Sequence, residues 1–194
     1  MRMRLQKQRC PMCARPAIDG ITHPRCLTPY GLDGLLTIFE YEGVIKKAIK
    51  AIKYRFVSDI AATLITTVPV ASWQHLALPK GTVLYPIPLH TERLAWRGFN
   101  QAEKLGIFVA QQLQLNLVVG LLTRVEKRVP QADISSRLAR IKNAQGQFKA
   151  ATEQLPTSIL LLDDVWTTGA TMKEAAKVLK RGGVNFIWGL TIAC

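Results

Sequence analysis

The stretch ILLLDDVWTTGAT, residues 159–171, decides the fold. It joins a fully apolar run of strand length to two acids, a short turn of hydroxyl residues and glycine, and a helical pattern over residues 171–181. A fully apolar run is typical of a central strand that is covered on both faces, as in parallel sheets. The stretch therefore predicts a strand–turn–helix unit of an α/β domain, with Asp163 and Asp164 at the end of the strand.

The turn after the two acids has the residue types of an anion site. The first backbone N–H groups of a helix lack partners within the helix and attract negative charge. Thr hydroxyls add donors, and Gly169 lets the backbone close round a phosphate where a Cβ would obstruct it. Two acids would repel a phosphate unless they hold hydroxyls or a metal, so a sugar phosphate fits, with its diol on Asp163 and Asp164. The simpler alternative is that Asp164 or Thr171 only caps the helix.

The rest of the chain alternates between strand and helix patterns. Short apolar runs predict strands, and apolar residues recurring every three or four positions predict helices. The predicted strands cover residues 35–41, 82–87, 117–122, 159–162 and 184–193, and the predicted helices cover 44–56, 58–68, 100–113, 136–143 and 171–181. This order predicts an α/β fold with a mostly parallel sheet flanked by helices.

Length and composition limit the classes of protein that this chain can belong to. Its 194 residues, 48% hydrophobic and 20% charged, suit one domain with a small appendage. We find no apolar stretch of membrane-spanning length, and residues 1–10 lack the apolar region of a secretory signal, so we expect a cytoplasmic protein without a membrane span. The net charge of +13 indicates a polyanionic partner, nucleic acid first and an anionic membrane or a phosphorylated substrate next, and a solvated basic surface is the alternative.

The cysteines near the start of the chain have metal-ligand spacing. Cys10 and Cys13 form a CxxC pair, and His23 and Cys26 form an HxxC pair after it. Four such ligands fit a tetrahedral structural zinc with no open position for catalysis. A disulfide or a redox CxxC is the alternative. We expect residues 1–30 to form a zinc-finger-like segment and residues 31–194 to form the α/β domain.

A second group of polar residues follows the predicted strand at 82–87. The sequence YPIPLH at 85–90 ends this strand with two prolines, which turn the chain out of a sheet. Arg93 and Arg97 come next, four residues apart. A guanidinium can donate two hydrogen bonds at once to a pyrophosphate, which favours an anion-binding role for both residues. The alternative is that they are ordinary surface arginines on a loop.

The segment from Asp163 to Thr171 closely resembles the phosphoribosyl-pyrophosphate (PRPP) motif of type I phosphoribosyltransferases. The resemblance implies that Asp163 and Asp164 bind the ribose hydroxyls. It also implies that five residues of the turn bind the 5′-phosphate: Thr167, Thr168, Gly169, Ala170 and Thr171.

Three blocks together resemble the ComF family, the competence-associated proteins related to phosphoribosyltransferases. They are PIPLH followed by RGFNQ, a basic stretch running from Arg124 through Arg140 to Phe148, and DDVWTTGAT. The resemblance implies a type I phosphoribosyltransferase-like fold with an N-terminal zinc finger, and a site for PRPP and Mg²⁺. Arg93 and Arg97 would lie near the pyrophosphate, and Asp163, Asp164 and Arg97 would be the catalytic residues.

Membership of this family would imply a role in natural transformation. Such a protein would handle incoming single-stranded DNA beside a ComFA-type helicase and the DNA-processing protein DprA, with or without phosphoribosyl transfer. The alternative is a metabolic phosphoribosyltransferase that acts on a small nitrogenous base and has no DNA role. The basic residues proposed to follow DNA phosphates are Arg2, Arg4, Arg9, Arg15, Arg25, Lys46, Lys47, Lys50, Lys53 and Arg55, with Tyr54 among them.

Overall fold

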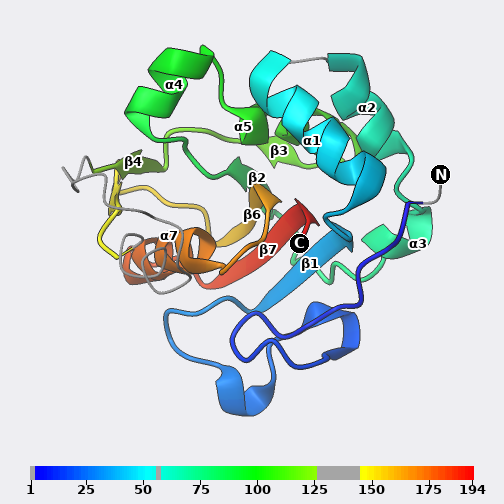
Figure 1. Ribbon diagram of the computed structural model, residues 1–194. Coiled ribbons are helices and arrows are strands. Elements are labelled where there is room, and N and C mark those ends of the chain that lie inside the picture. Colours follow the sequence, from blue (N-terminus) through cyan, green and yellow to red (C-terminus); the bar gives the residue numbers. More distant parts are fainter. Residues whose placement is uncertain (1–2, 56–57, 126–144) are drawn as a thin grey trace.

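The computed structural model describes residues 3–55, 58–125 and 145–194, and it contains the predicted parallel sheet (Figure 1). Five strands lie in the order β1-β7-β6-β2-β3, and every neighbouring pair is parallel. Their bounds are β1 Gly34–Phe39, β2 Val83–Pro86, β3 Asn116–Leu117, β6 Ser158–Val165 and β7 Phe186–Ala193. The apolar run at residues 159–162 lies in β6, the central strand, as its composition predicts.

Helices cover both faces of the sheet, which makes the structure a three-layer α/β arrangement (Figure 1). One face packs against α1 (Gly43–Arg55), α2 (Ser58–Thr66) and α5 (Gln101–Leu113). The other face packs against α7 (Ala170–Arg181) and a small antiparallel hairpin of β4 (Leu122–Arg124) and β5 (Phe148–Ala150). Two short helices, α3 (Val70–Trp73) and α4 (Thr91–Arg97), lie in connections.

Local sequence explains the helices that flank the sheet. In α1, Ile45, Ile49 and Ile52 repeat at helical spacing, and all three are buried against the sheet as predicted. Helix α5 begins after Asn100, whose side-chain oxygen accepts a hydrogen bond from the backbone N–H of Ala102 at 3.0 Å.

Two predicted strands differ from the observed ones. The prediction ended the central strand at Leu162, but β6 continues to Val165 and contains both acids. The single strand predicted over 117–122 is two strands in different sheets, because Gly120 adopts a positive φ of 79° between β3 and β4. An apolar run alone does not reveal such a turn.

Helix α4 was not predicted. The prediction turned the chain out of the sheet at the prolines and started the next helix at residue 100, whereas residues 91–97 are also helical. Gly98, with φ 75°, ends α4 by donating its N–H to the carbonyl of Leu94 at 2.7 Å. The helix predicted over 136–143 lies outside the described residues.

The N-terminal segment, here residues 3–33, lies along the edge strand β1 and includes two short 3₁₀ turns, η1 (Ile18–Gly20) and η2 (Pro24–Cys26). The side-chain amide of Gln8 both donates to the Thr37 carbonyl (2.9 Å) and accepts from the Thr37 N–H (3.1 Å). This side chain therefore satisfies part of the open edge of the sheet. Within the described parts of the chain, we find no helix with the length and apolar character needed to cross a bilayer.

Candidate functional site

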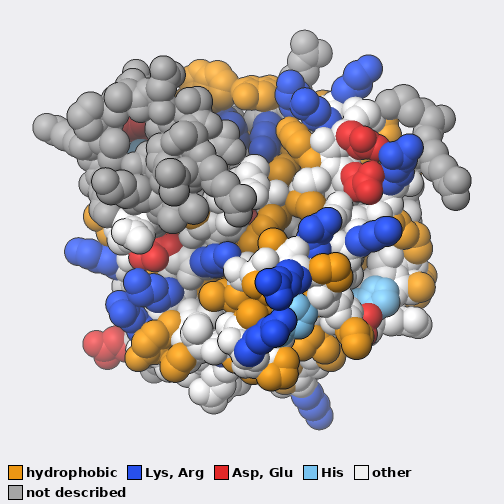
Figure 2. Space-filling model, turned by 60° about the horizontal axis from the view of Figure 1, so that its bottom comes forward, with side chains coloured by type: hydrophobic (Ala, Val, Ile, Leu, Met, Phe, Trp, Pro, Cys, Tyr) orange, Lys and Arg blue, Asp and Glu red, His pale blue; other side chains and the backbone are white. Residues whose placement is uncertain are grey.

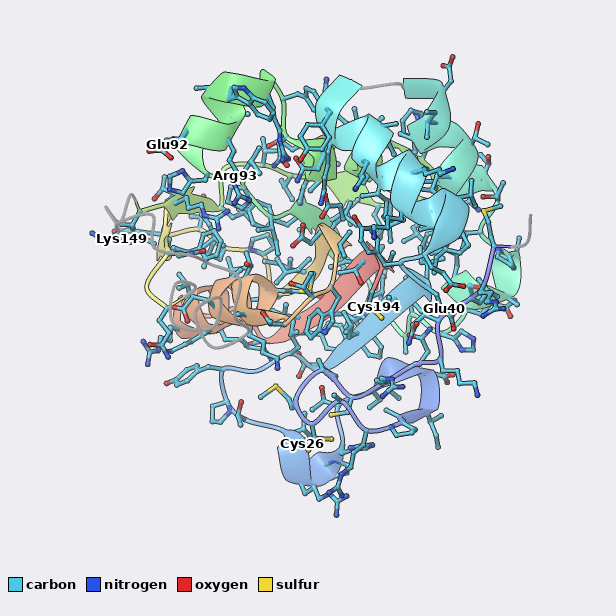
Figure 3. The ribbon with its side chains drawn as sticks, in the orientation of Figure 1. Cys26, Glu40, Glu92, Arg93, Lys149 and Cys194 are labelled. Atoms are coloured by element: carbon cyan, nitrogen blue, oxygen red, sulfur yellow. The ribbon has the colours of Figure 1, made fainter. Side chains whose placement is uncertain are left out.

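The four residues predicted to bind zinc come together in the N-terminal segment. One ligand atom from each of Cys10, Cys13, His23 and Cys26 lies within 4.8 Å of every other. The hairpin that carries the first pair is closed by hydrogen bonds between Cys10 and the backbone of Ala14 and Arg15. Figure 3 shows Cys26 at the part of the segment that projects away from the sheet. A Cys₃His set of this size fits a tetrahedral zinc ion.

Hydrogen bonds around the cluster prepare it for a metal. His23 Nε2 lies 3.0 Å from the Pro16 carbonyl oxygen, which can only accept, so Nε2 carries the proton. His23 Nδ1 then has the lone pair that can bind a metal, and this nitrogen lies 3.4 Å from Cys13 Sγ. Burial opposes ionisation of Cys10, but backbone hydrogen bonds, first from Cys13, outweigh it and lower the pKa of Cys10 to about 7.

The predicted phosphate-binding turn links β6 to α7. Thr167, Thr168, Gly169, Ala170 and Thr171 line a cavity of about 50 Å³ together with Asp163. Helix α7 begins at Ala170, so the N–H groups of its first turn lie in this segment, where that of Ala170 donates to Thr168 Oγ1 at 3.3 Å. Hydroxyl groups beside a helix N-terminus are an arrangement that favours negative charge.

Gly169 has a second role that sequence reasoning missed. Its φ is 70°, and a Cβ placed there would lie 2.1 Å from an atom of the Trp166 indole. The ammonium of Lys173 lies 5.6 Å from the centroid of the same ring. Glycine is therefore required both for the backbone turn and for the position of Trp166.

The adjacent acids point to opposite faces of the sheet, because β6 continues through both of them. Asp164 is only 5% exposed and faces α1, where Lys53 Nζ lies 2.9 Å from its Oδ2. Asp163 faces the turn cavity, and its Oδ1 accepts the N–H of Asp164 at 2.8 Å. The sequence pattern places Lys53 among the basic residues that contact DNA. It is instead the half-buried partner of Asp164.

Asp163 is the carboxylate with the strongly altered acidity. Burial, and then repulsion from Asp164, raise the pKa of Asp163 from 3.8 to about 7. The N–H of Asp164 and the charges of Lys53 and Arg124 act in the other direction but do not cancel these effects. A cation or a hydroxyl donor beside this buried carboxylate would stabilise its charged form. A magnesium-bound sugar offers both kinds of group.

The predicted arginines take two different positions. Arg97 packs on the ring of Tyr54 (5.4 Å to its centroid) and donates to Gln101 Oε1 at 3.0 Å, so it ties α4 to α1 and α5. Arg93 is exposed on α4, where Figure 3 shows it on the inner side of the helix, whereas Glu92 points away.

Arg124, the first residue of the predicted basic stretch, is the arginine that acts electrostatically on Asp163. It donates to the Pro88 carbonyl at 3.1 Å and to Gln147 Oε1 at 2.7 Å. Burial, and then repulsion from Arg93, lower the pKa of Arg124, while Asp163 raises it. The guanidinium of Arg124, on β4, therefore lies near Asp163 of β6 and Arg93 of α4. Residues 126–144 of this stretch, which include Arg140, lie outside the described residues.

A basic and aromatic surface lies beside α1 and α4. Lys46, Lys47 and Lys50 are exposed on α1, as predicted. Tyr54 is 60% exposed and contacts Trp96, which is 69% exposed, edge to face at 5.9 Å. Arg15 and Arg25 are also exposed, Arg4 pairs with Glu42 at 3.5 Å, and Arg9 Nη1 donates to the Ala14 carbonyl at 3.2 Å. Arg2 and the side chain of Arg55 lie outside the described part of the chain.

Comparison with known proteins identifies relatives over most of the chain. The DNA utilization protein YhgH of Salmonella typhi is 30% identical over 183 residues, which are 90% of this chain and 78% of that protein. Competence protein F of Haemophilus influenzae is 34% identical over 122 residues, covering 61% of this chain and 52% of that protein. Competence protein ComFC of Streptococcus pneumoniae is 36% identical over 100 residues, covering 51% and 42%.

No family model matches the chain. The extent and identity of the alignment to the Salmonella protein nevertheless exceed what chance resemblance gives, and the two competence proteins carry the family's name. Together with the motifs at residues 85–101 and 163–171, these similarities show that the chain belongs to the ComF family.

Proposed function

We propose that this protein serves a competence-related process of DNA utilization, binding PRPP with Mg²⁺ at the carboxyl edge of its sheet and single-stranded DNA on its basic surface. The relatives named for competence and for DNA utilization support the general role. In this proposal residues 31–194 form a type I phosphoribosyltransferase-like domain, residues 1–30 form its zinc finger, and the protein works beside a ComFA-type helicase and DprA.

The observation that carries PRPP binding is the placement of Asp163 beside the turn cavity. The 5′-phosphate would occupy the turn from Thr167 to Thr171, against the N–H groups that begin α7. The ribose hydroxyls and Mg²⁺ would satisfy the carboxylate of Asp163, whose charge is opposed by burial and by the neighbouring Asp164. Arg124 and Arg93 would face the pyrophosphate.

The residues of this edge suit pyrophosphate displacement from ribose C1. Mg²⁺, when bound, would supply charge neutralisation of the leaving pyrophosphate. Arg93, Arg97 and Arg124 would orient and stabilise it, with Arg97 positioned by its contact with Tyr54. Asp163 would hold the ribose, and the ion pair with Lys53 would fix the side chain of Asp164 on the opposite face of β6. Phosphoribosyl transfer is thus the reaction class that we propose if PRPP is turned over.

Calorimetry with PRPP and Mg²⁺ tests this site. Replacing Asp163 with Asn should abolish PRPP binding, whereas Glu153→Gln, which removes one exposed carboxylate elsewhere, should leave it unchanged. Unaltered affinity in Asp163→Asn would refute the site. A pyrophosphate-release assay with small bases and with DNA then decides between a metabolic enzyme and a DNA-directed one.

The observation that carries DNA binding is the combination of exposed lysines on α1 with the exposed Tyr54–Trp96 pair, because cationic grooves with aromatic side chains bind single strands. The affinity for an oligothymidylate should fall steeply with salt, and Lys47→Gln with Lys50→Gln should reduce the slope of log K against log salt by about 1.4. The matched control is Lys80→Gln with Lys149→Gln, on other elements. Affinity that is independent of salt would exclude this role.

A further inference from the structure

A cavity of about 510 Å³ lies between the N-terminal segment and the turn that begins α7. Residues 6–7 and 9–14 line one side, and Trp166–Thr168 with Lys173 line the other. We call it the knuckle cavity. Its volume falls within the range of about 300–1,000 Å³ that is usual for small-molecule sites. The cavity at Asp163 shares the turn residues 166–168 with it but has a different lining otherwise.

The lining of the knuckle cavity is cationic. Lys7, Arg9 and Lys173 contribute to it, and no acidic side chain does so among the residues that the structure describes. Thr167 and Thr168 add two hydroxyl groups. Figure 2, in which this end of the molecule comes forward, shows Lys and Arg side chains interspersed with hydrophobic ones. Such a lining is complementary to a phosphate group.

The same cavity contains an aromatic wall. The Trp166 indole lies in its lining. It occupies the space that a side chain at position 169 would fill, and the ammonium of Lys173 lies near the ring. An indole offers a flat face on which a nucleic acid base stacks with little dependence on its sequence. Phosphate-binding cations and a stacking ring in one cavity of this size match the two ends of a nucleotide.

We propose that the knuckle cavity binds one nucleoside monophosphate unit, with the base against Trp166 and the phosphate against Lys7 and Arg9. The unit is a free nucleotide or one nucleotide of a single DNA strand, since both present the same chemistry. This site adjoins the one proposed for PRPP and shares Thr167 and Thr168 with it, but it uses neither Asp163 nor Arg124. The zinc-binding hairpin, which supplies Cys10 and Cys13 to the lining, thereby becomes part of a ligand site as well as a structural element.

Calorimetry with thymidine monophosphate, thymidine and inorganic phosphate tests the proposal. The monophosphate should bind more tightly than either of its parts. Lys7→Ala with Arg9→Ala should weaken it about tenfold or more, because two charge-assisted contacts are lost. Trp166→Leu should weaken the monophosphate and not phosphate, and Trp166→Phe should retain most of the affinity. Zinc content equal to the parent protein shows that each variant keeps the metal-binding segment that lines the cavity.

Asp163→Asn separates this site from the PRPP site. It should leave the affinity for thymidine monophosphate within about twofold while removing PRPP binding. Competition by the monophosphate against an oligothymidylate would assign the cavity to a nucleotide of the strand, and binding without competition would assign it to free nucleotides. The proposal is overturned if the monophosphate does not bind, if Lys7→Ala with Arg9→Ala binds it normally, or if Asp163→Asn loses both ligands.

Discussion

Replacing Asp163 with Asn should stabilise the folded protein above pH 7 although it removes the proposed ligand contact. Burial and Asp164 raise the pKa of Asp163 from 3.8 to about 7, so the folded protein keeps a proton that the unfolded chain releases. The free energy of unfolding therefore falls as the pH rises from about 4 to about 7 and stays at the lower level above it. Asn carries no titrating proton and can still accept the N–H of Asp164.

The size of the effect follows from the shift in pKa. About three units correspond to an upper bound of about 4 kcal/mol, at 1.36 kcal/mol per unit. Since the two carboxylates titrate together, we expect the variant to gain about 2–4 kcal/mol over the parent at pH 8 and under about 2 kcal/mol at pH 5.

Urea unfolding of both proteins at pH 5, 6, 7 and 8 measures this difference. The zinc cluster also responds to pH, but it is the same in both proteins and cancels when the two free energies are subtracted. A difference that stays constant over this range, or that decreases toward pH 8, would show that Asp163 is not strained in the folded protein. Addition of Mg²⁺ and PRPP should reverse the order of stability, because only the parent binds them.

The remaining predictions concern the other parts of the site. Lys53→Met should destabilise the protein by about 3 kcal/mol in urea unfolding, because it leaves the buried Asp164 without a partner, and Lys53→Met with Asp164→Asn should lose clearly less; equal losses would count against the ion pair. Gly169→Ala should lower the free energy of unfolding by about 1–3 kcal/mol because of the positive φ, and further because the new Cβ meets the Trp166 indole. Adding Trp166→Leu to this variant should recover the second loss. Metal analysis should find about one zinc per chain, absent from Cys13→Ser; full occupancy in that variant would contradict the ligand set.

The sequence was sufficient for elements that depend on short-range pattern. The isoleucine spacing of α1 and the apolar run of β6 predicted both which segments are regular and which faces they bury. The Cys and His spacing likewise predicted the group that the structure gathers within 4.8 Å. In each case the physical cause lies within about 20 residues of chain, where periodicity and ligand spacing operate.

The sequence was insufficient where partners are distant in the chain or where one residue changes the backbone direction. Lys53 fits the polar side of α1 by its period, and only the packing of α1 on β6 gives it Asp164 as a partner. Gly169 was correctly expected at a tight turn, but nothing local shows that an indole takes the space of its side chain. The knuckle cavity is formed by segments far apart in the chain, residues 6–14 and 166–173 among them, and no local pattern in either segment indicates it.

The pairing of β1 with β7 has a consequence for how this protein is made. Residue Leu36 lies beside Leu190 in the sheet, so the first strand described pairs with a strand some 150 residues later. During synthesis the apolar β1 must wait for nearly all of the intervening chain before its parallel partner exists, and such non-local parallel contacts form slowly. The N-terminal segment contacts β1 through Gln8 and is synthesised before it. It can therefore shield the nascent strand from other chains during the wait, and loss of the zinc cluster should reduce the yield of folded protein as well as the stability of the product.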